Sequence, residues 1–259
     1  MKKRILVVIL LGLLICVGIS NGINIKPSQV IFNDPRPSVI LVCFGDSATK
    51  GAVEQHYPGY IEEWINPSED DVANEGKSGE TSGEGLQRLR NLIDSEEYPN
   101  AQVYAYWEGG NDIVDTMQEL DRFLIWDPTW PWYPFHEELD DLLGEVKENL
   151  RQGINKIRET DATPVLGTYY YLMAFKKCKH SPIHFLLPFQ VRHANHYVDK
   201  LNNVIYDLAY EEDVPLADIN KELGTMAYWH YYDFNHANAL GNRLIAEVWF
   251  EAVDTYLDY

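Results

Sequence analysis

A serine stands directly after the first long apolar run of the chain. The run VILVCF occupies residues 39–44, and the Gly-Asp-Ser that follows places Ser47 just beyond its end. A serine hydroxyl is a weak nucleophile until a base accepts its proton. The usual base is a histidine whose other ring nitrogen is held by a carboxylate. Ser47 is therefore a candidate nucleophile if the chain supplies such a histidine.

His236 is the histidine that best fits this role. Among eight histidines, it has an acid, Asp233, three residues before it in the stretch DFNH, just ahead of the last amphipathic segment. Residues at that spacing in a turn can touch, so Asp233 could orient and polarise the imidazole. The alternative is that Asp233 is an ordinary acid at a helix start, where the helix dipole favours it.

Two further polar clusters follow predicted strands. Residues 73–85 (ANEGKSGETSGEG) are rich in glycine, which lets a backbone turn its N–H groups toward a ligand. Residues 107–113 (WEGGNDI) carry an asparagine whose amide could donate to a developing negative charge. Attack on a carbonyl creates an oxyanion that needs such donors. Each cluster taken alone is also ordinary turn chemistry.

The elements that must position these residues alternate along the chain. Amphipathic helices are expected at about 139–157, 191–208 and 237–256, and β-rich runs occupy residues 39–44, 71–74, 101–107, 163–170 and 214–219. This alternation predicts an α/β fold with a mainly parallel sheet of five strands and helices on both sides. In such sheets ligands bind beyond the carboxyl ends of the strands, where Ser47 and both polar clusters lie.

Taken together, the four clusters resemble the SGNH hydrolases, the GDSL-type esterases and lipases, which are named for a Ser, a Gly, an Asn and a His in four blocks. The matching residues are Ser47 in FGDSATKG, Gly79 in NEGKSGETS, Asn111 in GGND and His236 in DFNH. The resemblance spans about residues 38–257. It implies a three-layer α/β/α sandwich with a five-stranded parallel sheet of flavodoxin-like topology.

The resemblance also implies roles for these residues. Ser47 would attack an ester carbonyl, His236 would accept and return the proton, and Asp233 would orient the imidazole. The oxyanion would be held by the N–H groups of Ser47 and Gly79 and by the side chain of Asn111. The family usually has leucine after the serine, where this chain has alanine. The expected activity is hydrolysis of carboxylic esters through a Ser-His-Asp triad and an acyl-enzyme.

Two other functions use the same residues. An O-acyltransferase would employ the same triad while excluding water, and a catalytically silent protein would only bind an ester or a glycan. Two unrelated folds fit less well. Thr49 stands where the G-x-S-x-G elbow of the α/β-hydrolases needs its second glycine, and GKSGE lacks the upstream glycine of a phosphate-binding loop.

An aromatic stretch, residues 123–138, is too rich in proline and tryptophan for a regular helix or a central strand. Its residues Trp126, Trp130 and Trp132 could overhang the site and bind substrate, stacking on sugar rings or gripping an acyl chain. They could equally cap a sheet edge or a helix end. The favoured substrate is an O-acetylated glycan, followed by a lipid or small-molecule ester.

The N-terminus has the composition of a secretory signal. Three cations precede an apolar run from Ile5 to Val17, and small residues follow it. We expect residues 1–20 to be a signal peptide or an uncleaved membrane anchor, residues 21–37 a leader, and residues 38–259 the hydrolase domain. The protein is then expected to be exported, with a possible N-terminal membrane tether. A lipoprotein site ending in LLIC lacks the small residue before its cysteine.

Charge and metal-binding residues limit the partners. The formal net charge of −19 disfavours nucleic acid and anionic membranes as partners, so the expected partner is the ester substrate. His193 and His196 lie three residues apart on a predicted helix, but no obvious third ligand accompanies them. We therefore expect no metal and no cofactor. The three cysteines imply no disulfide framework.

Overall fold

A parallel sheet forms the centre of the computed structural model, which describes residues 39–66, 70–176 and 186–259. All of these residues belong to one compact unit, Arg36–Tyr259. The strand order is β2-β1-β3-β4-β5 and all pairings are parallel. The strands are β1 (Leu41–Gly45), β2 (Val72–Gly76), β3 (Val103–Trp107), β4 (Thr163–Gly167) and β5 (Leu216–Ala217). The segments expected before Arg36 lie outside the described residues.

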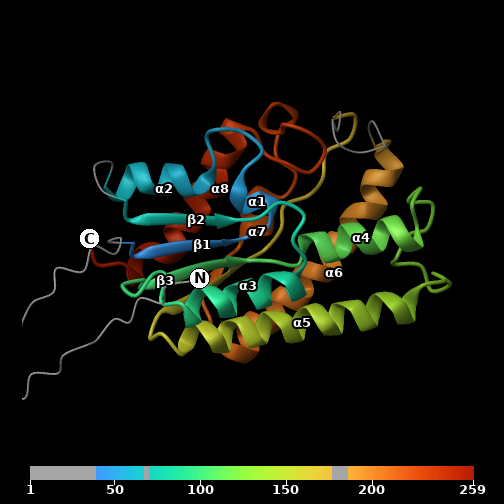
Figure 1. Ribbon diagram of the computed structural model, residues 1–259. Coiled ribbons are helices and arrows are strands. Elements are labelled where there is room, and N and C mark those ends of the chain that lie inside the picture. Colours follow the sequence, from blue (N-terminus) through green and yellow to red (C-terminus); the bar gives the residue numbers. More distant parts are fainter. Residues whose placement is uncertain (1–38, 67–69, 177–185) are drawn as a thin grey trace, which may run out of the picture. The chain divides into compact units, whose positions relative to one another are not determined.

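Helices cover both faces of the sheet (Figure 1), which confirms the three-layer α/β/α architecture. Helices α2 and α8 pack on one face, and α3, α5 and α6 lie on the other. The helices are α1 (Ser47–Lys50), α2 (Tyr57–Ile65), α3 (Ser82–Asp94), α4 (Gly110–Leu120), α5 (His136–Arg158), α6 (Pro188–Glu212), α7 (Ile219–Leu223) and α8 (Ala239–Val253). None of the helices in the described ranges is long and apolar enough to cross a membrane.

The apolar strands β1 and β3 lie at the centre of the sheet because both of their faces are covered. Every residue of the two strands is buried. Leu41 lies between Val72 and Val103 in register, so β1 has β2 on one side and β3 on the other. The connections from β1 and β3 therefore leave in opposite directions, and the carboxyl end of β1 lies at the switch point where open α/β sheets bind ligands.

The expected strand 163–170 ends early in the structure, at Gly167. Asn202 accepts a hydrogen bond from the N–H of Tyr169 at 2.7 Å and donates one to its carbonyl oxygen at 2.8 Å. Asn220 donates to the same carbonyl oxygen at 2.9 Å. Side-chain amides thus replace sheet partners where the chain leaves the sheet after β4, and the hydroxyl of Tyr169 reaches Asp46 after β1.

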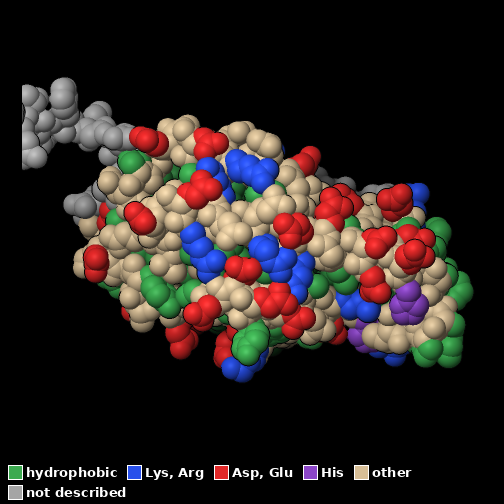
Figure 2. All heavy atoms as spheres, turned by 90° about the horizontal axis from the view of Figure 1, so that it is seen from below, with side chains coloured by type: hydrophobic (Ala, Val, Ile, Leu, Met, Phe, Trp, Pro, Cys, Tyr) green, Lys and Arg blue, Asp and Glu red, His purple; other side chains and the backbone are tan. Residues whose placement is uncertain are grey.

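Acidic and basic side chains alternate on the face seen in Figure 2. Arg151 on α5 pairs with Glu148, Glu211 and Glu212, and Lys147 also pairs with Glu211. These pairs are exposed to solvent, so each contributes little to stability. The basic groups on this face are interspersed with acids, which does not favour a polyanionic partner there.

Candidate active site

Ser47 is fixed where β1 passes into a short helix. The strand ends at Gly45, and the carboxylate of Asp46 caps α1 by accepting the N–H of Ala48 at 2.7 Å. This turn places Ser47 as the first residue of α1, half-buried at the carboxyl end of the sheet. The N–H of Ser47 is not hydrogen-bonded to any other described residue.

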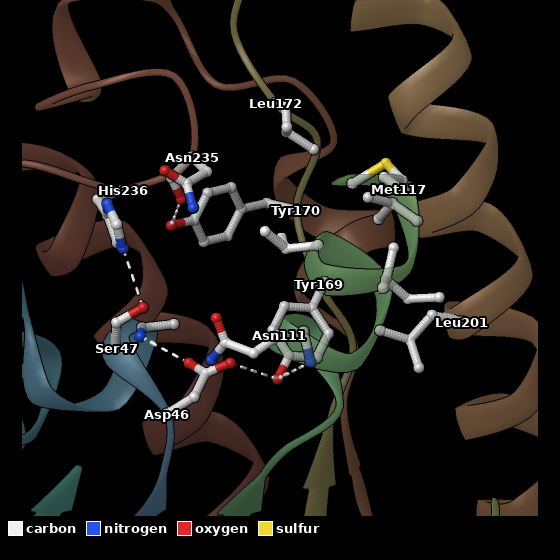
Figure 3. Close-up of a pocket in the computed structure, with 15 residues that line it drawn as sticks. Asp46, Ser47, Asn111, Met117, Tyr169, Tyr170, Leu172, Leu201, Asn235 and His236 are labelled. Carbon is white, nitrogen blue, oxygen red and sulfur yellow. Dashed lines mark hydrogen bonds between the residues drawn. The ribbon is translucent and has the colours of Figure 1, made fainter. Parts of the chain in front are cut away.

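His236 reaches Ser47 from a closed loop before α8. Residues 231–237 are pinned by an antiparallel bridge between Tyr231 and Ala237, and the buried ring of Tyr231 anchors the loop. The Oγ atom of Ser47 lies 2.9 Å from Nε2 of His236 (Figure 3). The two residues are 189 positions apart, so this contact is made by the fold alone.

Asp233 holds the other side of the imidazole. Both of its carboxylate oxygens lie 3.0 Å from Nδ1 of His236, and Oδ1 also accepts the N–H groups of Asn235 at 3.1 Å and of His236 at 2.8 Å. Burial by itself raises the pKa of Asp233, but the hydrogen bonds and the charge of His236 outweigh it and the pKa lies below its ordinary value. An ionised Asp233 places the ring proton on Nδ1, which leaves Nε2 to accept the proton of Ser47.

Asn111 lies in the first turn of α4, beside Ser47. Its Nδ2 donates one hydrogen to the carbonyl oxygen of Glu80 at 2.9 Å, which leaves the second hydrogen for a ligand. Gly79 lies in the turn after β2 with φ of +78°, a backbone conformation that favours glycine. Its N–H has no hydrogen bond to another residue in the described part of the chain.

A sequence profile of the GDSL-like lipase/acylhydrolase family matches residues 43–244. The chain belongs to this family. It is an SGNH/GDSL-type carboxylic ester hydrolase. A comparison with curated proteins finds no match.

Solved structures of several hydrolases share this fold at low sequence identity. The lipase/acylhydrolase from Enterococcus faecalis superposes with a TM-score of 0.59 at 19% identity, over 85% of this chain and 97% of its own. The acetyl xylan esterase AlAXEase superposes with a TM-score of 0.54 at 20% identity, over 83% of this chain and 100% of its own. The esterase EstA from Pseudoalteromonas sp., in a structure inhibited by monoethylphosphonate, has a TM-score of 0.55 at 17% identity, over 85% of this chain and 99% of its own.

An ionic cluster of Glu75, Glu80 and Arg88 lies next to the polar groups of this hydrolase site. The carbonyl oxygen of Glu80 connects the two, because it accepts the hydrogen bond from Asn111. Arg88 on α3 contacts the carboxylate of Glu80 through Nε at 2.9 Å and Nη2 at 2.5 Å, and Nη2 also lies 2.9 Å from the carbonyl oxygen of Glu75 and 3.4 Å from that of Gly45. Arg88 thereby ties α3 to the ends of β1 and β2. Burial raises the pKa of Glu108 well above its ordinary range, and the charges of Asp46 and Glu80 add to the effect. Burial thus favours the protonated form of Glu108.

Asp46 lies beside Ser47 and is another of the polar groups of the site. Burial raises its pKa to about 6, although hydrogen bonds from the Ala48 N–H and the Tyr169 hydroxyl oppose the shift. The Tyr169 hydroxyl donates to Asp46 at 3.2 Å and accepts the N–H of Gly110 at 3.1 Å. The carboxylate of Asp46 also caps α1. Asp112 instead accepts the N–H and hydroxyl of Ser82, both at 2.7 Å, and so links α4 to α3.

A cavity with an empty volume of about 600 Å³ opens beside Ser47 of the hydrolase. Figure 3 shows Ser47, Asp46 and His236 on one side of it, with Met117 and Leu201 opposite. The lining consists of polar groups at the catalytic end and of aliphatic and tyrosine side chains elsewhere, namely Asp46, Ser47, Ala48, Gly110, Asn111, Ile113, Val114, Met117, Tyr169, Tyr170, Leu172, Val198, Leu201, Asn235 and His236.

The tryptophans Trp126, Trp130 and Trp132 are not among the residues that line this cavity. Trp130 packs instead against Trp132 and the ring of His193, with ring centroids 5.8 and 5.9 Å apart. Asp121 explains this placement, since its buried carboxylate accepts the N–H groups of residues 125 and 126 and turns the loop away. Figure 2 shows hydrophobic side chains gathered at the end of the molecule where this loop lies.

The two histidines of the helical pair bind protein groups. Nδ1 of His193 lies 2.8 Å from the carbonyl oxygen of Leu124, and Nδ1 of His196 lies 2.8 Å from a carboxylate oxygen of Asp127. Within the described ranges, no three His, Cys, Asp or Glu side chains are grouped so that they could hold a metal ion. These contacts fasten the aromatic loop to α6.

Sequence reasoning missed Tyr169, Tyr170 and Arg88. The two tyrosines end the run TPVLGTYY, and a polar-tipped pair at the carboxyl end of a parallel strand is a signal that could have placed them at the site. Arg88 had a weaker signal: it follows Thr81-x-x-Glu84, a capping-box pattern that predicts the start of α3. The N–H of Thr81 donates to Glu84 at 3.3 Å in the structure.

Proposed function

We propose that the hydrolase is a serine esterase in which Ser47 is the nucleophile, His236 the general base and acid, and Asp233 the group that orients the imidazole. The observation that carries this proposal is the chain of contacts from Ser47 Oγ to His236 Nε2 at 2.9 Å and from His236 Nδ1 to both oxygens of Asp233 at 3.0 Å. Such a chain makes a hydroxyl nucleophilic at neutral pH.

Acylation follows from these positions. Ser47 Oγ bonds to the carbonyl carbon of the ester while its proton moves to Nε2 of His236. The bond from this carbon to the alcohol oxygen then breaks, and the imidazolium returns the proton to the departing oxygen. The carboxylate of Asp233 stabilises the imidazolium while it exists.

Deacylation repeats the sequence with water. His236 accepts a proton from water, the resulting hydroxide attacks the acyl carbon, and Ser47 leaves as its oxygen regains a proton. An alcohol in place of water would make the protein an acyltransferase. Product analysis with added alcohol acceptors separates these two outcomes.

The oxyanion of both steps needs fixed donors. We assign this role to the N–H groups of Ser47 and Gly79 and to Nδ2 of Asn111. The support is that both N–H groups lack partners among the described residues and that Asn111 retains an unused hydrogen. Donors oriented in advance stabilise a developing charge without reorganisation.

Turnover of p-nitrophenyl acetate by purified Ser47→Ala and His236→Ala variants tests the proposal. Each variant should lose at least about 10³-fold in kcat while its circular dichroism spectrum matches that of the parent. Turnover within tenfold of the parent in either variant contradicts the assignment.

We also propose that the protein is exported. The support is the sequence pattern of three cations followed by an apolar run at the N-terminus. Fractionation of the source cells with an antibody to the hydrolase domain tests this. Recovery of the protein in the cytoplasmic fraction alone contradicts it.

A further inference from the structure

The hydroxyl of Tyr169 joins the turn that carries Ser47 to the start of α4. It donates to the carboxylate of Asp46 at 3.2 Å and accepts the N–H of Gly110 at 3.1 Å (Figure 3). Asp46 directly precedes Ser47, and Gly110 directly precedes Asn111. One hydroxyl group therefore links the backbone beside the proposed nucleophile to the backbone beside a proposed donor to the oxyanion.

The hydroxyl of Tyr170 makes the corresponding contact with the loop that carries His236. It donates to the carbonyl oxygen of Asn235, the residue before His236, at 2.8 Å. The ring of Tyr170 also packs against that of Tyr231, which anchors this loop, with ring centroids 6.0 Å apart. Together with Tyr169, it connects β4 to three catalytic segments that are distant in sequence.

The two tyrosine rings span the end of a whole strand to make these contacts. In the sheet, β3 lies between β4 and β1. Neighbouring strands are about 4.8 Å apart, so β4 and β1 are separated by about 10 Å. Trp107 ends β3, and its ring centroid lies 5.2 Å from that of Tyr169 and 6.3 Å from that of Tyr170. Packed aromatic rings thus carry both hydroxyls across β3.

The backbone from which these side chains extend is itself held in place. Asn202 bonds to both the N–H and the carbonyl oxygen of Tyr169, and Asn220 bonds to the same carbonyl oxygen. Burial raises the pKa of Tyr169 and of Tyr170 well above the ordinary value, so the protonated form that donates a hydrogen bond is favoured. Each hydroxyl can therefore hold its partner at a fixed distance and angle.

We propose that the hydroxyls of Tyr169 and Tyr170 are positioning groups of the esterase. Tyr169 sets the place of Asn111 relative to Ser47. Tyr170 sets the place of His236. This inference rests on the proposed function of those three residues, and neither tyrosine lies in the four sequence blocks that pointed to the site. A displacement of about 1 Å in a catalytic group can cost on the order of 100-fold in rate, so a hydroxyl that acts through its neighbours affects kcat.

Phenylalanine at either position removes the hydroxyl and keeps the ring. Tyr169→Phe and Tyr170→Phe should each lower kcat for p-nitrophenyl acetate by about tenfold to 100-fold, with little change in KM. Tyr171→Phe is the matched control. Its hydroxyl donates to Asp199 on α6 and its side chain does not line the cavity, so kcat should stay at the parental value.

Double variants show through which group each hydroxyl acts. In the Asn111→Ala background, Tyr169→Phe should cost less than about threefold in kcat, because the group that it positions is absent. Tyr170→Phe should keep its full effect in that background, since it acts through His236. A role in stability alone would lower the midpoint of thermal unfolding and would not produce this difference between the two tyrosines.

Gly110→Ala disturbs the contact of Tyr169 without removing a hydroxyl. The added methyl carbon would lie 2.8 Å from Oδ2 of Asp46 and 2.8 Å from Cε1 of Tyr169. Non-bonded carbon atoms normally lie about 3.5 to 4.0 Å apart, so the methyl group should push the two residues apart. We expect kcat to fall to about the level of Tyr169→Phe.

The outcomes separate this inference from the proposed function. A kcat within about threefold of the parent in both phenylalanine variants, or an equal loss from Tyr169→Phe with and without Asn111, overturns the inference and leaves the esterase intact. Turnover that survives Ser47→Ala overturns the proposed function and this inference with it. Losses in both phenylalanine variants, of which only that of Tyr169→Phe disappears in Asn111→Ala, support the proposal.

Discussion

On one side of the active site, Ser47 and His236 are fixed by hydrogen bonds; on the other, Met117 and Leu201 make apolar contacts that have no preferred direction (Figure 3). A hydrogen bond fixes distance and angle, whereas apolar packing fixes mainly shape and volume. The polar side can therefore impose a reaction geometry. The apolar side can only favour substrates that fill it.

This difference teaches where each kinetic property is set. Changes on the polar side should lower kcat, because they remove interactions that exist in the transition state. Changes on the apolar side should act on substrate preference and KM. The predictions below concern the polar side and the neighbouring buried charged groups, from the largest effect to the smallest.

The largest effect is expected for Asp233→Asn. The amide keeps the shape of the side chain but can hold the imidazole in the wrong tautomer, so kcat should fall by about 10³- to 10⁴-fold with little change in KM. Steady-state kinetics with p-nitrophenyl acetate measure this split. A loss below tenfold would show that Asp233 only holds the loop before α8 through the N–H groups of Asn235 and His236.

Asn111→Ala comes next. Removing one donor to an oxyanion typically costs about 10²- to 10³-fold in kcat, and KM should change little. The matched control is Asn91→Ala, an exposed asparagine on α3, which should retain parental kinetics. Equal kinetics in the two variants would remove Asn111 from the proposed oxyanion site.

In the ionic cluster of Glu75, Glu80 and Arg88, Arg88→Met should lower the free energy of unfolding by about 3 kcal/mol, because only the exposed Lys77 then remains to pair with the buried carboxylate of Glu80. Glu108→Gln should change it by less than about 1 kcal/mol, since burial favours the protonated form of the Glu108 carboxyl, which the neutral amide resembles. Urea denaturation at pH 7 measures both. A larger loss in Glu108→Gln than in Arg88→Met would contradict this charge assignment.

The smallest effect concerns pH. The pKa of Asp46 is raised to about 6 in the folded protein and is about 3.9 in an unfolded chain, so folding favours its protonated form. Its contribution to stability is present below pH 4 and is lost as the pH rises through 6. The difference in unfolding free energy between parent and Asp46→Asn should fall by about 2 kcal/mol from pH 4 to pH 7. A difference that stays constant would contradict the shift.

The spacing of apolar residues along the chain predicted the strands and helices whose buried faces that spacing determines. The apolar run ending before Ser47 became β1, and the periodic leucines and isoleucines at 139–157 became the centre of α5. Helices α3 and α4 were missed because glycines lie in or next to their first turns and are typical of loops. There, tertiary hydrogen bonds such as that from Ser82 to Asp112 stabilise helices that local propensity does not favour.

The site divides in the same way. Asp233 and His236 are three residues apart, so their contact could be predicted from spacing. The direction of the aromatic loop could not, because it depends on Asp121 and on contacts with α6 that are distant in sequence. The apolar cavity could not be predicted from the sequence either, since it arises where side chains of α4 and α6 leave space between them.

The central claim, that His236 activates Ser47 for attack, is tested most directly by treating the protein with an ethyl fluorophosphonate and locating the adduct by mass spectrometry. We expect a single adduct on the peptide containing Ser47, none in Ser47→Ala, and labelling slowed by at least about 10³-fold in His236→Ala. An adduct on another residue, or labelling of Ser47 at the parental rate without His236, would contradict the account.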